Sequence, residues 1–200
     1  MTFRIGLTGS IGMGKSTTAQ MFADEGIPVW SADAAVHALY APDGGASPSI
    51  LAEFPEARGD DGSVSRPALK RLIAADPTVL DRLQALLIPH LAESREAFYW
   101  KHLGDPMILL DVPLLIENGL VGECDGIAVV TAPPEIQRQR VTSRGTMTEA
   151  EVDFILSRQM PDSEKQRWAR WIIPTTDLDT ARAAVKDVLA DVRQRIAKHA

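Results

Sequence analysis

The sequence predicts an α/β fold in which a five-stranded parallel sheet is covered by helices. Short apolar segments typical of buried strands alternate with longer segments whose apolar residues recur every three or four positions. Such alternation favours strand–helix–strand units with parallel strands. The first strand also runs directly into a glycine-rich turn that opens a helix, which is the local arrangement of a phosphate-binding loop. We therefore expect a three-layer core of the P-loop NTPase type, with a helical substrate-binding insertion and a helical lid.

The phosphate-binding motif lies within residues 8–17, where Gly9, Gly14, Lys15 and Ser16 occupy the fixed places of G-x-x-x-x-G-K-[ST]. Residues 3–7 are expected to form the preceding strand and residues 16–23 the following helix. Glycines let backbone N–H groups approach an anion, and the helix N-terminus adds partial positive charge. Lys15 is expected to reach the β- and γ-phosphates, and Ser16 to ligate Mg²⁺. The expected nucleotide-binding residues of the loop are Gly9, Gly12, Met13, Gly14, Lys15, Ser16 and Thr17. The alternative is a glycine-rich turn that only opens a helix.

Length and composition limit the class of protein. The chain has 200 residues and a net charge of −6, so it has no global basic field and we expect no nucleic-acid partner. Cys124 is the single cysteine, which excludes an intramolecular disulfide and agrees with a reducing compartment. The longest apolar runs are too short to span a bilayer, and residues 1–25 do not resemble a secretory signal. We expect a cytoplasmic protein without a membrane partner, either a monomer or a weak homo-oligomer.

The second strand is expected at residues 27–30, followed by Ser31, Ala32 and Asp33. Ligands of open α/β sheets bind beyond the carboxyl ends of the strands, so Asp33 is expected on the same rim as the phosphate loop. The alternative is that Asp33 caps the next helix, expected at residues 34–40, because aspartate is favoured at that position. Both interpretations can hold together.

The next segment has a different character. Prolines and glycines interrupt residues 41–66, apart from a short helix expected at residues 49–54, and a helical pattern then runs from Pro67 to Trp100. We assign residues 34–104 to a helical insertion that binds the acceptor substrate, and residues 1–33 and 105–200 to the nucleotide-binding core.

The third strand, residues 107–111, ends in Asp111. Its apolar run is typical of a buried parallel strand. Asp111 either assists Mg²⁺, as a strand-end acid does in phosphate-loop proteins, or fixes the turn at Val112-Pro113. Glu117 either faces the substrate or lies at an exposed helix end.

The last part of the core carries an arginine-rich helical segment, residues 138–165, which we expect to form a lid. It follows the fourth strand, residues 126–131, and a helix opened by Pro133-Pro134. Arg140 and Arg144 share a helical face, and the guanidinium fork binds phosphate bidentately. A second lid helix is expected at residues 149–160. The alternative is a solvated charged hairpin. A fifth strand at residues 171–173 and a final helix at residues 178–197 complete the core.

The sequence resembles the dephospho-CoA kinase family over nearly its whole length. The resemblance is carried by residues 5–17, Ser31-Ala32-Asp33, the segment from Asp61-Gly62 to Arg66, Val112-Pro113-Leu114-Leu115-Ile116-Glu117, Gln137-x-x-Arg140, Arg144, Arg158-Gln159 and Lys165. The phosphate loop alone would indicate only a phosphate-loop protein. The later motifs, in this order, are much more specific.

The resemblance implies transfer of the ATP γ-phosphoryl group to the ribose 3′-hydroxyl of dephospho-CoA, with ATP and Mg²⁺ as cofactors. It implies Asp33 as the catalytic base, with Lys15 and Arg140 also catalytic, and Arg140 and Arg144 as ATP contacts. Ser16 would hold Mg²⁺, with Asp33 or Asp111 as a further contributor. Ser10 and Met13 replace the family's usual Gly and Ser, and we expect tolerance because backbone amides do much of the binding. The family's adenine-side contacts near the fifth strand do not transfer to Arg170 and Thr175.

Two other functions fit the loop. One is another small-molecule or nucleoside monophosphate kinase with the same core, which the insertion would distinguish. The other is a regulatory nucleotide switch without a small-molecule acceptor. A regulatory switch assigns no common function to Asp33 and the arginine-rich segment.

Overall fold

The computed structural model describes residues 2–143, 152, 155–157 and 159–199. Its sheet has five strands: β1 Phe3–Thr8, β2 Val29–Ser31, β3 Met107–Asp111, β4 Gly126–Thr131 and β5 Trp171–Pro174. They lie in the order β2-β3-β1-β4-β5, and β1 pairs in parallel with β3 and β4. The predicted five-stranded parallel sheet is therefore confirmed. Strand β2 differs most from its expected bounds, because it starts at Val29 and ends at Ser31. The Pro28 carbonyl before it accepts a hydrogen bond from the Leu109 N–H of β3.

The strands are buried on both faces. In β1, Ile5 and Leu7 are fully buried in one apolar cluster, which they share with Phe22 and Val188 of two helices. Gly6, between them, points the other way, because successive strand residues face opposite sides of a sheet. A Cβ added to Gly6 would lie 2.7 Å from both Leu115 Cδ1 and Cys124 Sγ. Other segments of the chain therefore pack tightly against both faces of β1, as the three-layer prediction requires.

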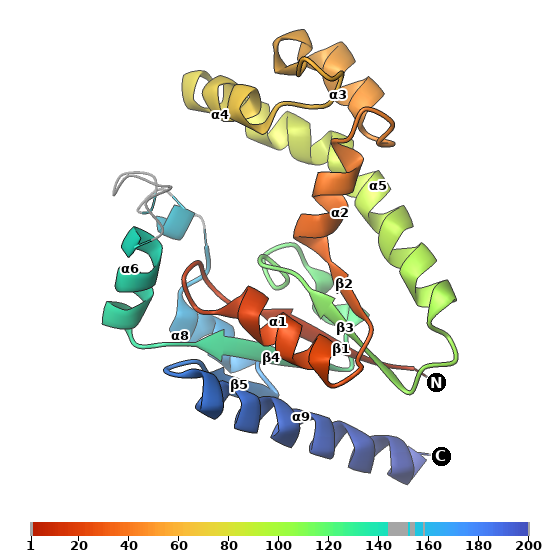
Figure 1. Cartoon of the computed structure of the whole chain (residues 1–200), viewed down its shortest axis with the longest axis vertical. Coiled ribbons are helices and arrows are strands. Elements are labelled where there is room, and N and C mark those ends of the chain that lie inside the picture. The colour runs from red at the N-terminus through yellow and green to blue at the C-terminus, as the bar shows by residue number, and fades with distance from the viewer. Residues whose placement is uncertain (1, 144–151, 153–154, 158, 200) are drawn as a thin grey trace. The chain divides into compact units, whose positions relative to one another are not determined.

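One layer consists of helices α1, Lys15–Asp24, and α9, Leu178–His199, which lie side by side along the sheet (Figure 1). The other side of β1 is covered by the segment from Val112 to Cys124, which ends in the 3₁₀ turn η2, Leu120–Glu123. Helix α6, Pro134–Ser143, follows β4, and α8, Asp162–Lys165, with η3, Gln166–Trp168, precedes β5. The last helix extends to the end of the described chain, slightly beyond its predicted end.

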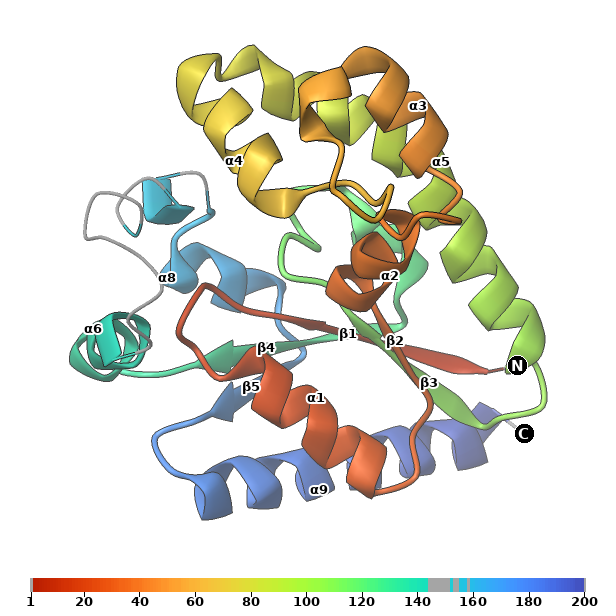
Figure 2. The same cartoon turned by 45° about the horizontal axis from the view of Figure 1, so that its top comes forward.

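The chain divides into two compact units, residues 1–30 with 102–200 and residues 31–101. The division falls a few residues before each boundary expected from the sequence. The second unit contains α2 Ala32–Leu39, α3 Ser47–Glu53, η1 Pro55–Ala57, α4 Arg66–Ala75 and α5 Thr78–Lys101. Figure 2 shows α3 and α4 gathered around one half of α5. This unit has its own apolar core, which includes Ile50, Leu69, Leu83 and Leu87.

The helical pattern from Pro67 to Trp100 forms the two helices α4 and α5. The chain breaks at Asp76-Pro77, where the Asp76 carboxylate accepts hydrogen bonds from the N–H and the hydroxyl of Thr78, at 2.9 and 2.8 Å. A carboxylate that satisfies the first N–H groups of a helix fixes where that helix begins. Pro89 lies inside α5 without ending it.

The expected lid is described only in part. Helix α6 carries its first residues and α8 its last, and residues 155–157 are helical. Arg144, Arg158 and half of the helix expected at residues 149–160 lie outside the described residues. Within the described part of the chain, no helix combines the length and apolarity needed to cross a membrane.

Candidate active site

The topology of the sheet places four chain segments at one edge. Strand β1 lies between β3 and β4, so the chain leaves β1 at the point where the strand order reverses, which is where α/β sheets bind ligands. Because the strands are parallel, the residues that end or follow them meet at this edge. They are Gly9–Gly14 after β1, Asp111 at the end of β3, Thr131 at the end of β4 and Thr175 after β5.

The backbone of the phosphate loop requires glycine at several places. Gly12 and Gly14 have φ angles of 79° and 83°, a region that side chains rarely adopt. Gly9 lies against Val130, where an added Cβ would overlap the valine side chain. Helix α1 starts at Lys15, and no side chain caps it and no acid lies in its first turn. The N–H groups and the positive end of this helix therefore suit an anion, with Ser16 and Thr17 exposed beside them.

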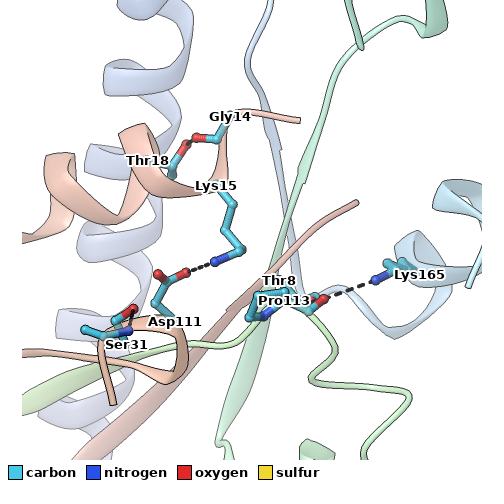
Figure 3. Close-up of polar contacts among 9 residues, drawn as sticks. Thr8, Gly14, Lys15, Thr18, Ser31, Asp111, Pro113 and Lys165 are labelled. Atoms are coloured by element: carbon cyan, nitrogen blue, oxygen red, sulfur yellow. Dashed lines mark hydrogen bonds and ion pairs between the residues drawn. The ribbon is translucent and has the colours of Figure 1, made fainter. Parts of the chain in front are cut away.

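Lys15 forms an ion pair with Asp111 (Figure 3). Its Nζ lies 2.7 Å from Asp111 Oδ1, and the two side chains are only 10% and 6% exposed. The pairing of β1 with β3 places Asp111 beside the end of β1, since Leu7 lies opposite Asp111, and the phosphate loop leads from that end to Lys15. The turn after Asp111 is held by the backbone, where the Val112 N–H donates to the Leu7 carbonyl. The carboxylate thus holds the loop lysine, and its contribution to Mg²⁺ binding stays a prediction.

Met13 points away from the nucleotide side of the loop. Its side chain is 3% exposed, and its Sδ accepts a hydrogen bond from the Ala132 N–H at 3.1 Å. The Met13 carbonyl accepts from the hydroxyl of Thr175 at 2.8 Å. Met13 therefore anchors the loop to the ends of β4 and β5, and can offer a ligand only its backbone.

Thr175 also binds Arg140. The guanidinium donates to the Thr175 hydroxyl at 3.1 Å and to the Thr175 carbonyl. A Cβ added to Gly14 would lie 3.2 Å from Thr175, so this threonine lies directly beneath the loop. Sequence reasoning missed Thr175. The only available signal was its place just beyond the carboxyl end of a strand.

Asp33 lies in the first turn of α2 and is exposed, and it belongs to the second unit. The interpretation of Asp33 as the helix cap is wrong. Helix α2 begins at Ala32, and the Ser31 hydroxyl accepts the Ala34 N–H at 3.4 Å instead. The capping residue thus precedes Asp33 by two positions, and the charge of Asp33 lies near the helix N-terminus, where a negative charge is favourable.

Asp33 lines a cavity of about 560 Å³ within the second unit. Its lining combines charged and apolar side chains. Two cations on α4, Arg66 and Lys70, accompany Asp33 and Tyr40, and the other lining residues are Val36, Leu69, Ile73, Leu80 and Leu83. Arg66 is positioned by the turn before α4, where the Val64 N–H donates to the Tyr40 carbonyl and Ser65 caps the helix. The guanidinium lies 5.8 Å above the Tyr40 ring.

The comparisons with known proteins identify the family of the chain. The family model for dephospho-CoA kinase matches residues 3–179. The chain belongs to the dephospho-CoA kinase family. A dephospho-CoA kinase of Cereibacter sphaeroides is 55% identical over 192 residues, which cover 96% of both chains. A solved structure from Thermus thermophilus is 34% identical, with a TM-score of 0.81, and the match covers 95% of this chain and 97% of that one.

A solved dephospho-CoA kinase from Campylobacter jejuni is 20% identical, with a TM-score of 0.71, and the match covers 98% of this chain and all of the other. At this identity the likeness concerns the fold alone. The family model and the high identity over the full length favour the dephospho-CoA kinase interpretation over the two alternatives, another small-molecule kinase and a regulatory switch.

The motif Val112–Glu117, by which the sequence resembles the dephospho-CoA kinase family, ends in a buried ion pair. Glu117 Oε1 lies 2.8 Å from Lys165 Nζ and accepts the Met160 N–H at 2.9 Å. Lys165 is fully buried and also donates to the Pro113 carbonyl, which accepts the Thr8 hydroxyl as well (Figure 3). The interpretation of Glu117 as an exposed helix end is wrong. This network joins the end of β1, the segment after β3 and the chain before β5.

Two opposing effects set the pKa of Glu117. Burial raises the pKa of its carboxyl, but the hydrogen bonds from Lys165 and from the Met160 N–H together outweigh burial and hold the pKa below its ordinary value. Glu117 is therefore an anion at neutral pH. It neutralises Lys165, whose ammonium would otherwise be buried without a counter-charge.

The residues present fit Mg²⁺ only together with a triphosphate. Among the described residues, no group of three or more His, Cys, Asp or Glu side chains is arranged to hold a metal ion. A magnesium ion that keeps several waters and binds mainly to substrate phosphates needs no such group. The exposed Ser16 hydroxyl at the start of α1 is suitably placed to provide one protein ligand.

Proposed function

We propose that this protein transfers the γ-phosphoryl group of ATP to the ribose 3′-hydroxyl of dephospho-CoA, giving coenzyme A and ADP. The observation that carries the proposal is the cavity of the second unit, because its lining matches the chemistry of this acceptor. Dephospho-CoA combines ribose hydroxyls, a diphosphate and a long pantetheine arm of low charge. Asp33 suits the hydroxyl, Arg66 and Lys70 suit the diphosphate, and the aliphatic wall suits the arm.

The donor half of the reaction belongs to the phosphate loop. The amides at the start of α1 bind the phosphate oxygens, and Lys15 exchanges Asp111 for the β- and γ-phosphates when ATP is bound. Ser16 would hold Mg²⁺, with Asp111 or Asp33 as a further contributor. When bound, the ion would supply positive charge that neutralises the phosphates.

The acceptor half belongs to Asp33. Its carboxylate orients the 3′-hydroxyl and takes the proton as the 3′-oxygen forms its bond to the γ-phosphorus. The bond from that phosphorus to the β,γ-bridging oxygen breaks, and ADP leaves with the electron pair. The exposure of Asp33 leaves the carboxylate accessible to a substrate hydroxyl.

Charge neutralisation and positioning supply most of the rate in such a transfer, because the transition state is loose. Arg140 is held at the same edge as the loop by Thr175. We propose that its guanidinium neutralises charge on the transferring group. Arg144, outside the described residues, is proposed to share this task.

Replacing the carboxylate of Asp33 tests the proposal directly. Asp33→Asn keeps the size of the side chain but removes the base, so kcat should fall on the order of 10²-fold or more, while ATP remains bound with unchanged affinity. Rates are measured as ADP release with saturating dephospho-CoA, and ATP affinity by calorimetry. A variant that turns over at the wild-type rate would show that Asp33 is not the base.

A further inference from the structure

One residue of the phosphate loop has its backbone held from two sides. The carbonyl of Ile11 accepts a hydrogen bond from Gln137 Nε2 at 2.7 Å, and the N–H of Ile11 donates to Gln159 Oε1 at 3.0 Å. The two glutamines are 22 positions apart in the sequence, one on α6 and one shortly before α8. Both the donor and the acceptor of Ile11 are thus satisfied by side chains rather than by the loop itself.

Helix α6 contacts the loop at the next two residues as well. A Cβ added to Gly12 would lie 2.6 Å from Val141 Cγ2 and 2.8 Å from the Gln137 carbonyl. Met13 is bound through Thr175, which Arg140 of α6 also contacts. Three consecutive loop residues are therefore connected to one helix, and Gln137 supplies the hydrogen bond at the first of them.

Glutamine suits this task for a chemical reason. A neutral carboxamide offers both a donor and an acceptor without adding charge beside a polyanion. A carboxylate at either place would repel the phosphates, and an ammonium or guanidinium would compete with Lys15 for them. The donor of one carboxamide and the acceptor of the other match the carbonyl and the N–H of the Ile11 backbone.

We propose that Gln137 and Gln159 are positioning residues for the nucleotide. By holding the backbone of Ile11 on both sides they fix the loop in the conformation in which its remaining amides face the phosphates. The loop is then already ordered before ATP binds. Ordering it during binding would cost free energy and reduce the affinity for ATP. The inference rests on the proposed function only in taking ATP as the donor.

The test compares Gln137→Met and Gln159→Met with the matched control Gln139→Met. Methionine keeps the length and volume of glutamine but forms neither hydrogen bond. Gln139 lies on α6 beside Gln137 but is exposed to solvent. For each variant, the Kd of a non-hydrolysable ATP analogue, the KM for dephospho-CoA and the melting temperature are measured.

Each test variant should raise the Kd of the analogue about 3- to 10-fold, which corresponds to one net hydrogen bond. The KM for dephospho-CoA should stay within error of wild type, and Gln139→Met should change neither constant. Because both glutamines hold the backbone of the same residue, the double variant should not show the product of the two single effects.

The proposal is overturned if the Kd of the analogue is unchanged in both test variants, or if the control weakens it equally. It is also overturned if ATP and dephospho-CoA are weakened alike together with a loss of melting temperature, since this pattern indicates a merely structural role. A failure of the proposed function looks different. In that case the wild-type protein binds the analogue and the glutamine effects persist, but no phosphoryl group reaches dephospho-CoA.

Discussion

Two ion pairs at the candidate site each join a lysine to a carboxylate. Asp111 pairs with Lys15, and Glu117 pairs with the fully buried Lys165. The first pair lies at the start of the phosphate-binding helix, where an incoming phosphate can replace the carboxylate. Within the described network, no group is placed to replace the carboxylate of the second pair. This pair joins three chain segments. We therefore assign the first pair to nucleotide binding and the second to stability.

The Glu117–Lys165 pair should make stability depend on pH. The folded state holds the pKa of Glu117 below the ordinary value of about 4.3, so the unfolded chain takes up this proton first as the pH falls. The contribution is complete above that value and is lost as the pH falls through the folded pKa. Glu117→Gln should therefore lower the free energy of unfolding at pH 7 by about 3 kcal/mol, because it leaves Lys165 without a counter-charge.

The measurement is urea unfolding of wild type, Glu117→Gln and the control Glu164→Gln between pH 7 and pH 3. Glu164 is an exposed acid next to Lys165 in the sequence. The difference between wild type and Glu117→Gln should shrink toward low pH. A difference that stays constant over the whole range would mean that the carboxylate of Glu117 does not carry the effect.

At the residue scale, the sequence predicts residues that belong to local motifs and misses those defined by contacts between distant segments. The loop glycines and Lys15 were predicted because their spacing is fixed by the turn they form. Thr175 was missed because a threonine after a strand has no distinguishing pattern, and its role depends on the adjacency of β4 and β5 to the loop. The pairing of Glu117 with Lys165 was missed for the same reason.

At the element scale, the central relation is that of helix α6 to the phosphate loop. Gly12 has a positive φ and leaves room for Val141 and for the carbonyl of Gln137. The loop conformation and the position of this helix therefore depend on one another. A change that displaces α6 should affect nucleotide binding even though it alters no phosphate contact.

Gly12→Ala should weaken ATP binding and lower stability by about 1–3 kcal/mol, because the new methyl group meets α6 and the backbone angle is unfavourable. Gly26→Ala is the matched control. Gly26 has φ of 81°, and nothing lies within 4 Å of an added Cβ. Its replacement therefore lowers stability only through the unfavourable backbone angle. Equal losses of stability in the two variants, with unchanged ATP affinity in Gly12→Ala, would contradict the coupling of loop and helix.

Element boundaries follow the sequence where a local signal sets them. The bounds of β3 and β4 were predicted correctly because each is a continuous apolar run ended by a polar residue. Helix α2 starts earlier than predicted because Ser31, rather than Asp33, satisfies its first N–H groups. Both residues are good caps, so composition alone does not decide between them.

At the scale of the whole molecule, two compact units each carry one half of the proposed chemistry. The first unit has the phosphate loop and its own core around Ile5 and Phe22. The second has a separate core and the cavity lined by Asp33, Arg66 and Lys70. The sequence predicted a helical insertion, but the lining of its cavity depends on how α2, α4 and α5 pack, which the helical pattern does not specify.

Arg66→Ala should therefore affect the acceptor alone. Loss of one charge-assisted contact to a phosphate should raise the KM for dephospho-CoA about tenfold and leave the KM for ATP unchanged. Arg71→Ala, an exposed arginine of the same helix outside the cavity lining, should change neither constant. Initial rates with each substrate varied in turn provide the measurement. An equal rise for ATP, or none for dephospho-CoA, would remove Arg66 from the acceptor site.

The most direct test of the central claim is ADP release by the wild-type protein from ATP and Mg²⁺, with and without dephospho-CoA. We predict that release depends on dephospho-CoA, is not supported comparably by nucleoside monophosphates, and yields one coenzyme A, phosphorylated at the 3′-oxygen, for each ADP. ADP release at the same rate without an acceptor, or with a nucleoside monophosphate in its place, would contradict the account.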